Sequence, residues 1–147
     1  MTKLHFYFHD TVVGKNPSAI QIAQANNTYQ SPTWFGLVRM MDNPLTVKPE
    51  PNSEVIGRAQ GFYGSASFED FEYLMNLNIV FTKGIYNGST LGILGHNQIF
   101  HKYREMSIVG GSGVFRLARG IATAETYYKD KTELNVILEF HVVVLHY

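Results

Sequence analysis

The sequence predicts an all-β fold, an eight-stranded antiparallel β-barrel formed by a single domain over residues 1–147. Apolar and polar side chains alternate along most of the chain, which is the pattern of strands with one buried face. Turn-forming residues separate these segments at hairpin-length intervals, and no segment shows the apolar period of a long helix. A barrel is favoured over a sandwich, because closure removes the edges that such apolar strands would otherwise expose.

The first predicted strand covers residues 4–10, in which Leu4, Phe6 and Phe8 share one face. A loop rich in Asn, Gln and Ser follows to about residue 32. The second predicted strand covers 35–41 and is closed by Asp42-Asn43-Pro44, where a loop with three prolines begins. Six further strands are predicted at about 55–66, 73–83, 88–97, 105–109, 113–127 and 133–146.

A glycine cluster lies between two of these strands. Gly110, Gly111 and Gly113 fall between Val109 and Val114, and this spacing predicts a glycine-rich hairpin loop. A nucleotide-binding loop is disfavoured, because no Lys follows the glycines and no helix-forming segment succeeds them.

Composition excludes several classes of protein. Twelve basic and twelve acidic side chains cancel, and no block of like charge marks a nucleic-acid or membrane partner. No apolar run approaches the ~18 residues of a membrane-spanning helix. The chain has no cysteine, which rules out a disulfide framework, thiol catalysis and thiolate metal sites.

Two short motifs bear on location. Asn26-Asn27-Thr28 and Asn87-Gly88-Ser89 are N-glycosylation acceptor sequences, so Asn26 and Asn87 are predicted glycosylation sites if the protein is secreted. Such triplets also arise by chance, and the residues alone leave secretion open.

The last predicted strand is apolar on more than one face. Its inner face is wholly apolar, and the opposite face carries Ile137, Val143 and Leu145 beside polar residues. Exposed apolar side chains on a strand are typical of a subunit contact. The sequence therefore predicts a homo-oligomer.

Asp10 is the first candidate for chemistry. It is in phase with Leu4, Phe6 and Phe8, so it faces the core, where burial would raise its pKa and suit it to act as a general acid. In the alternative interpretation, Asp10 begins the next loop and caps the amide of Val12 or Val13.

Three more polar residues are in phase with inward-facing apolar or small residues, namely Tyr63, Asn97 and, less clearly, Thr126. Small residues beside them leave room for a ligand inside the barrel. The alternative is that these groups satisfy one another or bound water. Arg104 either orients a ligand oxygen or forms a surface ion pair with Glu105 or Glu125.

The six histidines do not predict a metal site. His5 and His9 would lie ~13 Å apart along one strand, too far to share an ion. His141 and His146 point to opposite faces, and His96 and His101 flank a loop without an acidic partner.

Five strings, in order, resemble the plant dirigent protein family over about residues 4–147. They are Phe6-Tyr7-Phe8-His9-Asp10, Asp42-Asn43-Pro44-Leu45-Thr46, Gly57-Arg58-Ala59-Gln60-Gly61, Asn87-Gly88-Ser89-Thr90, and Val109-Gly110-Gly111-Ser112-Gly113 with Arg119-Gly120-Ile121-Ala122. The resemblance implies an eight-stranded antiparallel barrel, a homotrimer, and secretion to the apoplast after removal of a leader. It also implies a pocket for a small phenolic substrate.

Departures from the family pattern favour one branch. Lignan-forming members have Asp at the position of Asn97, a second Tyr at Ser65, Asp at Val114 and a Cys pair that this chain lacks. Arg104-Glu105-Met106 and Leu145-His146-Tyr147 are similar to the branch that includes the legume pterocarpan synthases. The family's pocket positions fall on Asp10, Tyr63, Asn97, Arg104 and Thr126.

The implied activity is that of a hydro-lyase of isoflavonoid phytoalexin biosynthesis, a pterocarpan synthase that dehydrates a 2′-hydroxyisoflavanol through a quinone methide. Asp10 and Arg104 would be catalytic, and Tyr63, Asn97 and Thr126 would bind substrate. No cofactor is expected, because the reaction involves no net redox change. The alternative function is a dirigent protein without its own bond chemistry, which directs stereoselective coupling of phenoxy radicals in lignan formation.

Overall fold

A computed structural model describes all residues from 1 to 147. It contains nine β-strands, three short 3₁₀ turns and no α-helix. The strands are β1 (Thr2–Asp10), β2 (Ala19–Ala23), β3 (Val38–Thr46), β4 (Val55–Ser65), β5 (Glu72–Phe81), β6 (Thr90–Gln98), β7 (Arg104–Ser112), β8 (Arg119–Lys129) and β9 (Val136–Leu145). No helix is long and apolar enough to cross a membrane.

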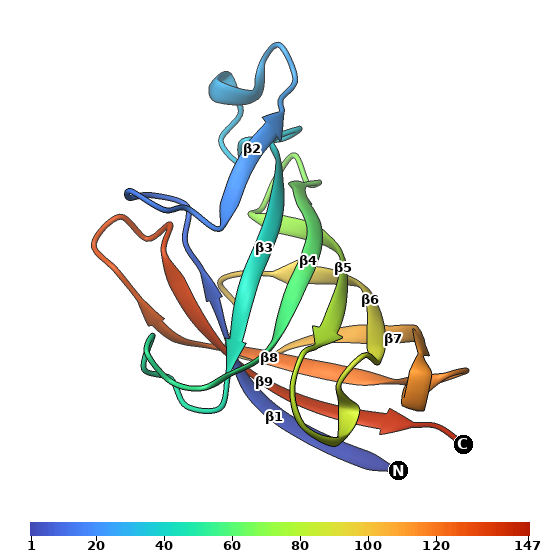
Figure 1. The fold of residues 1–147 in the computed structure, drawn as a ribbon. Coiled ribbons are helices and arrows are strands. Elements are labelled where there is room, and N and C mark those ends of the chain that lie inside the picture. The colour runs from blue at the N-terminus through green and yellow to red at the C-terminus, as the bar shows by residue number, and fades with distance from the viewer.

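Eight of the strands close into a barrel, which confirms the predicted fold. Each strand from β3 to β8 pairs antiparallel with the next, and β9 pairs with β1. β1 closes the ring on β3 through Tyr7 opposite Thr46 and Phe8 opposite Leu45. β2 pairs only with β3 and lies outside the ring. In Figure 1 it projects at the end of the barrel away from the two termini.

The second barrel strand is longer than predicted. It does not end at Asp42-Asn43-Pro44 but continues as β3 to Thr46. Backbone N–H groups alternate sides along a strand, and the Asp42 N–H points to the β2 side, where it bonds to the Ser18 carbonyl. Pro44 nitrogen faces that same side, in the gap between the residues that pair with β2 and those that pair with β1. The missing proline donor therefore costs no ladder hydrogen bond.

Two loop predictions were also wrong in detail. The polar segment before residue 32 contains β2. Its side chains are largely exposed, and the strand is held by its pairing with β3. The glycine cluster is not a loop as a whole: Gly110 and Gly111 continue β7, which bulges near Gly92 of β6. The turn begins at Gly113, whose φ of 65° favours glycine, and β8 starts only at Arg119.

The two ends of the barrel interior differ. Phe115 packs against Phe81 and Tyr86, with ring centroids 5.6 and 5.0 Å apart, and fills the end near the termini. Phe6 and Phe8 stack on Phe140 in the middle. Beyond them, toward the β2 end, the side chains leave a cavity.

Candidate active site

The cavity occupies the open end of the barrel and has a volume of about 670 Å³. Because neighbouring strands are antiparallel, this end collects the last residues of β1, β4, β6 and β8 and the first residues of β3, β5, β7 and β9. The residues predicted from alternation and resemblance all line it: Asp10, Tyr63, Asn97, Arg104 and Thr126.

Asp10 ends β1 and is held by two hydrogen bonds. Tyr63 OH donates to its Oδ2 at 3.0 Å, and Asn43 Nδ2 donates to its Oδ1 at 3.2 Å. The alternative interpretation, in which Asp10 caps the following loop, was wrong. Asn135 Oδ1 accepts the hydrogen bonds of the Val12 and Val13 amides instead.

The surroundings of Asp10 raise its pKa. Burial among cavity side chains such as Phe8 and Leu138 disfavours the carboxylate and is the largest influence on this pKa. The hydrogen bonds from Tyr63 and Asn43 and the positive charge of Arg39 oppose this shift, but they are smaller. The carboxyl group therefore holds its proton to a higher pH than an exposed aspartate does.

Tyr63 and Asn97 face the cavity from β4 and β6, as predicted. They are 2% and 3% exposed. Burial, followed by the nearby Asp10, raises the pKa of Tyr63, so its phenol stays protonated as a donor to Asp10. Asn97 Oδ1 is buried and has no hydrogen-bond partner within the protein.

Arg104, at the start of β7, is not a surface ion-pair residue. It is 4% exposed, and it donates to the Ile99 carbonyl at 2.9 Å and to Thr126 Oγ1 at 2.7 Å. It forms no ion pair with Glu105 or Glu125, and its Nε has no partner in the protein. Burial lowers its pKa, but an arginine remains charged at physiological pH.

Thr126 lies at the rim and is exposed, unlike the other predicted residues. A register shift in β8 directly follows it, between Thr126 and Tyr128. Its hydroxyl fixes the position of the Arg104 guanidinium.

Sequence reasoning missed three polar residues of the site, Arg39, Asn43 and Tyr73. Arg39 is 5% exposed, lines the cavity from β3, and its Cζ lies 5.9 Å from the centre of the Tyr63 ring. Tyr73 lies beside Tyr63, with ring centroids 4.9 Å apart. The signal was the alternation itself, since Arg39 and Asn43 are in phase with the buried Leu37, Met41 and Leu45.

Both predicted glycosylation residues are exposed. Asn26 lies in the turn after β2, and Asn87 lies in the turn before β6. Both positions are accessible to a glycan, and their occupancy stays a prediction.

The fold and cavity define a closed antiparallel β-barrel with an internal cavity, in which the carboxyl group of Asp10 lies among aromatic rings and two buried arginines. The profile of the dirigent-like protein family matches residues 1–145. The chain belongs to this family, which confirms the resemblance found in the sequence.

Relatives match nearly the whole chain. Pterocarpan synthase 1 of Glycine max is 48% identical over 147 residues, which are 99% of this chain and 79% of that protein. Dirigent protein 23 of Arabidopsis thaliana is 44% identical over 146 residues, covering 99% of this chain and 78% of the relative. A solved structure of a pterocarpan synthase dirigent protein superposes with a TM-score of 0.89 at 47% identity, covering 99% and 88% of the two chains. A second superposes at 0.91 with 43% identity, covering 99% and 95%.

Proposed function

We propose that this chain is a pterocarpan synthase, which dehydrates a 2′-hydroxyisoflavanol and closes the pterocarpan ring. The observation that carries the proposal is the carboxyl of Asp10, which combines a raised pKa with a position in the wall of a cavity lined in part by aromatic rings. The similarity of the whole chain to two pterocarpan synthases supports the same substrate class.

In the proposed reaction, Asp10 donates its proton to the benzylic 4-hydroxyl group of the substrate. The C4–O bond breaks and water leaves, while the 7-hydroxyl group loses its proton and the ring becomes a quinone methide. The 2′-phenol oxygen then bonds to C4. Its proton is released, the 7-oxygen is protonated again, and Asp10 regains a proton. The net change is the loss of one water, so the reaction needs no redox cofactor and is that of a hydro-lyase.

The buried arginines supply the complementary charge. Negative charge builds up on the 7-oxygen as its proton leaves, and a buried guanidinium stabilises that charge more than solvent does. Arg104 has an Nε donor without a partner, and Thr126 and the Ile99 carbonyl hold its guanidinium in place. We assign Arg104 to a substrate oxygen on this basis.

Tyr63 and Asn97 complete the proposed substrate contacts. Tyr63 holds the Asp10 carboxyl in position, and Asn97 lines the cavity with a buried Oδ1 that has no partner within the protein. An unpartnered buried acceptor favours a substrate that brings a donor to it. Fixing the substrate in one folded conformation would determine the stereochemistry of ring closure.

The proposal is tested by incubating the pure protein with racemic 2′-hydroxyisoflavanol, without oxidase or cofactor, and resolving the products by chiral chromatography. Formation of one pterocarpan enantiomer is expected. A parallel incubation with coniferyl alcohol and a separate oxidase tests the alternative dirigent function. Enantiomeric excess of a lignan there, together with no pterocarpan in the first incubation, would overturn the proposal.

We also propose that the protein is a secreted homotrimer of the apoplast. The exposed acceptor residues Asn26 and Asn87 and the partly apolar outer face of β9 support this. Mass measurement of the protein isolated from plant apoplastic fluid, before and after glycosidase treatment, tests location and glycosylation together.

A further inference from the structure

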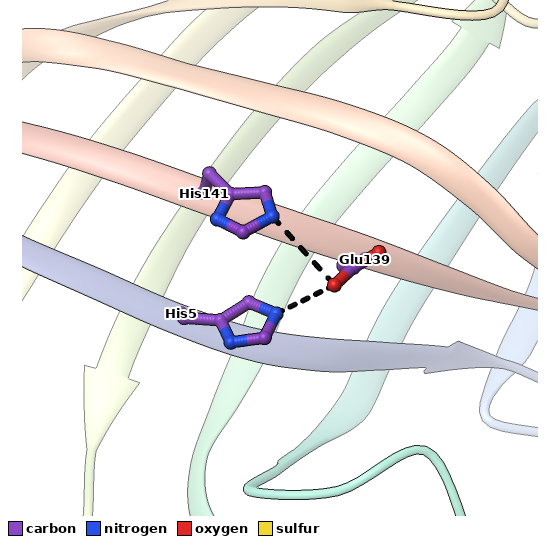
Figure 2. Close-up of side chains that lie close together, drawn as sticks. All are labelled: His5, Glu139 and His141. Atoms are coloured by element: carbon purple, nitrogen blue, oxygen red, sulfur yellow. Dashed lines mark hydrogen bonds and ion pairs between the residues drawn. The ribbon is translucent and has the colours of Figure 1, made fainter.

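Three side chains capable of binding a metal ion gather on the outer wall of the barrel, away from the cavity. They are His5 of β1 and Glu139 and His141 of β9. Figure 2 shows both imidazole rings side by side, with a nitrogen of each directed at the same Glu139 oxygen. One ligand atom from each residue lies within 4.8 Å of the other two.

The sheet holds this cluster together. His5 and His141 are directly opposite each other in the β1–β9 ladder, and Glu139 is two residues from His141 on the same face. Directly opposite residues of antiparallel strands have their Cβ atoms only about 5 Å apart. The backbone therefore sets the spacing of the three side chains, and a ligand does not need to order a loop.

The distances are close to those of a metal site. His5 Nε2 lies 2.7 Å and His141 Nε2 lies 3.6 Å from Glu139 Oε2. Donor atoms around a tetrahedral zinc ion are roughly 3.4 Å apart. The rings are stacked, with centroids 4.4 Å apart and planes 3° from parallel, so one ring must rotate for both nitrogens to converge on an ion. His141 is exposed and free to make that rotation.

We propose that His5, Glu139 and His141 form a binding site for a divalent transition-metal ion of the zinc or copper class. Two imidazoles and one carboxylate are ligands that these ions prefer, and water would complete the coordination. The set has no soft sulfur ligand and too few oxygens for calcium or magnesium.

A neighbouring side chain supports the carboxylate. Tyr7 OH donates to Glu139 Oε2 at 3.1 Å, and Tyr127 packs edge-on against the Tyr7 ring. Hydrogen bonds to a ligating carboxylate orient it and are common around metal sites.

The site is distinct from the catalytic cavity. None of its three residues lines the cavity, because β1 and β9 turn alternate side chains inward and outward. It lies instead on the same outer face as Val143, where a subunit contact is expected. A bound ion would therefore act on the surface or assembly of the protein, and the proposal does not rest on the pterocarpan synthase function.

The experiment is a calorimetric titration of the untagged protein with zinc chloride at pH 7.5, repeated with His5→Gln, Glu139→Gln and His141→Gln. The matched control is His96→Gln. His96 forms the same kind of exposed pair with Glu72, at 2.9 Å, but the pair has no third ligand close enough to complete a group of three. Cobalt(II) absorption spectra of the same variants report coordination directly.

We expect one saturable zinc site per chain in the unmodified protein. Each cluster variant should bind at least about tenfold more weakly, by the usual cost of losing a metal-site residue, and His96→Gln should bind normally. No saturable binding, or equal binding by the His141→Gln variant, would overturn the proposal. Loss of binding in His96→Gln with the cluster variants unaffected would overturn it as well.

Discussion

Asp10 acquires its chemical character from its neighbours. Burial raises its pKa, whereas Tyr63 and Asn43 orient both carboxyl oxygens without delivering a full charge. Arg39, whose Cζ lies 5.9 Å from the centre of the Tyr63 ring, lowers the pKa of Asp10, but its influence is smaller than that of burial. The result is a carboxyl group that is fixed in place and still able to donate a proton.

Replacing Asp10 by Asn should abolish turnover while leaving the fold intact. An amide keeps the size and can accept the hydrogen bond of Tyr63, but it cannot donate a proton as an acid does. The loss of general acid catalysis corresponds to a fall in kcat of about 10²–10⁴-fold. Kinetics with the isoflavanol and circular dichroism of the variant measure the two effects separately. Full activity in the Asp10→Asn protein would exclude Asp10 as the general acid.

The raised pKa of Asp10 also predicts a dependence on pH. Its folded pKa lies above its unfolded value, so its stabilising contribution is complete below the unfolded pKa and is lost as the pH rises through the folded pKa. The melting temperature of the Asp10→Asn variant, relative to that of the unmodified protein, should therefore increase as the pH rises. Over the same range kcat/KM should fall. A difference in melting temperature that does not change between pH 4 and pH 8 would contradict this.

Asn97 tests the branch of the family. We expect Asn97→Asp to leave dehydration unchanged or slower, since only one leaving group needs a proton. A second carboxyl in the same buried cavity would also couple to the titration of Asp10. Initial rates of pterocarpan formation, with the melting temperature as a check on folding, provide the measurement. A large gain in rate would indicate a protein derived from the lignan-forming type.

At the scale of the elements, the barrel wall depends on close approach between strands. An added Cβ at Gly120 of β8 would lie 2.0 Å from the Val143 carbonyl oxygen of β9. At Gly110 of β7, an added Cβ would meet nothing within 4 Å. A side chain would therefore clash with the neighbouring strand at Gly120, whereas Gly110 has room for one.

Gly120→Ala should therefore lower the free energy of unfolding by about 1–3 kcal/mol or more, because the strand must shift away from its neighbour. Gly110→Ala should be neutral or stabilising by up to about 1 kcal/mol, because alanine suits a strand interior better than glycine. Urea denaturation of both variants measures the difference. Equal free energies of unfolding would show that β8 and β9 do not approach as closely as described.

At the scale of the whole molecule, assembly is expected to use the outer face of β9. Val143→Glu places a charge on this face and should dissociate the oligomer, with little effect on the barrel interior. Leu74→Glu is the control: Leu74 is 45% exposed on β5, which lies across the ring from β9. Light scattering after size exclusion reports the mass of each protein. A monomeric unmodified protein at micromolar concentration would refute the expected trimer.

Alternation along the chain was sufficient to predict the eight barrel strands and the inward faces of Asp10, Tyr63 and Asn97. This information is local, because side chains of a strand change sides at every residue whatever the strand pairs with. Alternation also placed Thr126, less clearly, on an inward face, whereas the structure leaves it exposed at the rim. The sequence left Arg104 with two possible roles, and its hydrogen bond to Thr126 is a property of the folded chain.

Local patterns could not show where the strands end or which residues of different strands contact one another. β3 runs through Pro44 because, on the side away from β4, its pairing partner changes from β2 to β1 at that point. The predicted strand ended before Asn43, so the sequence did not place Asn43 in the site. His5 and His141 are 136 positions apart, and only the β1–β9 register brings them together. The burial that raises the pKa of Asp10 likewise requires the closed barrel, because it comes from side chains on strands distant in sequence.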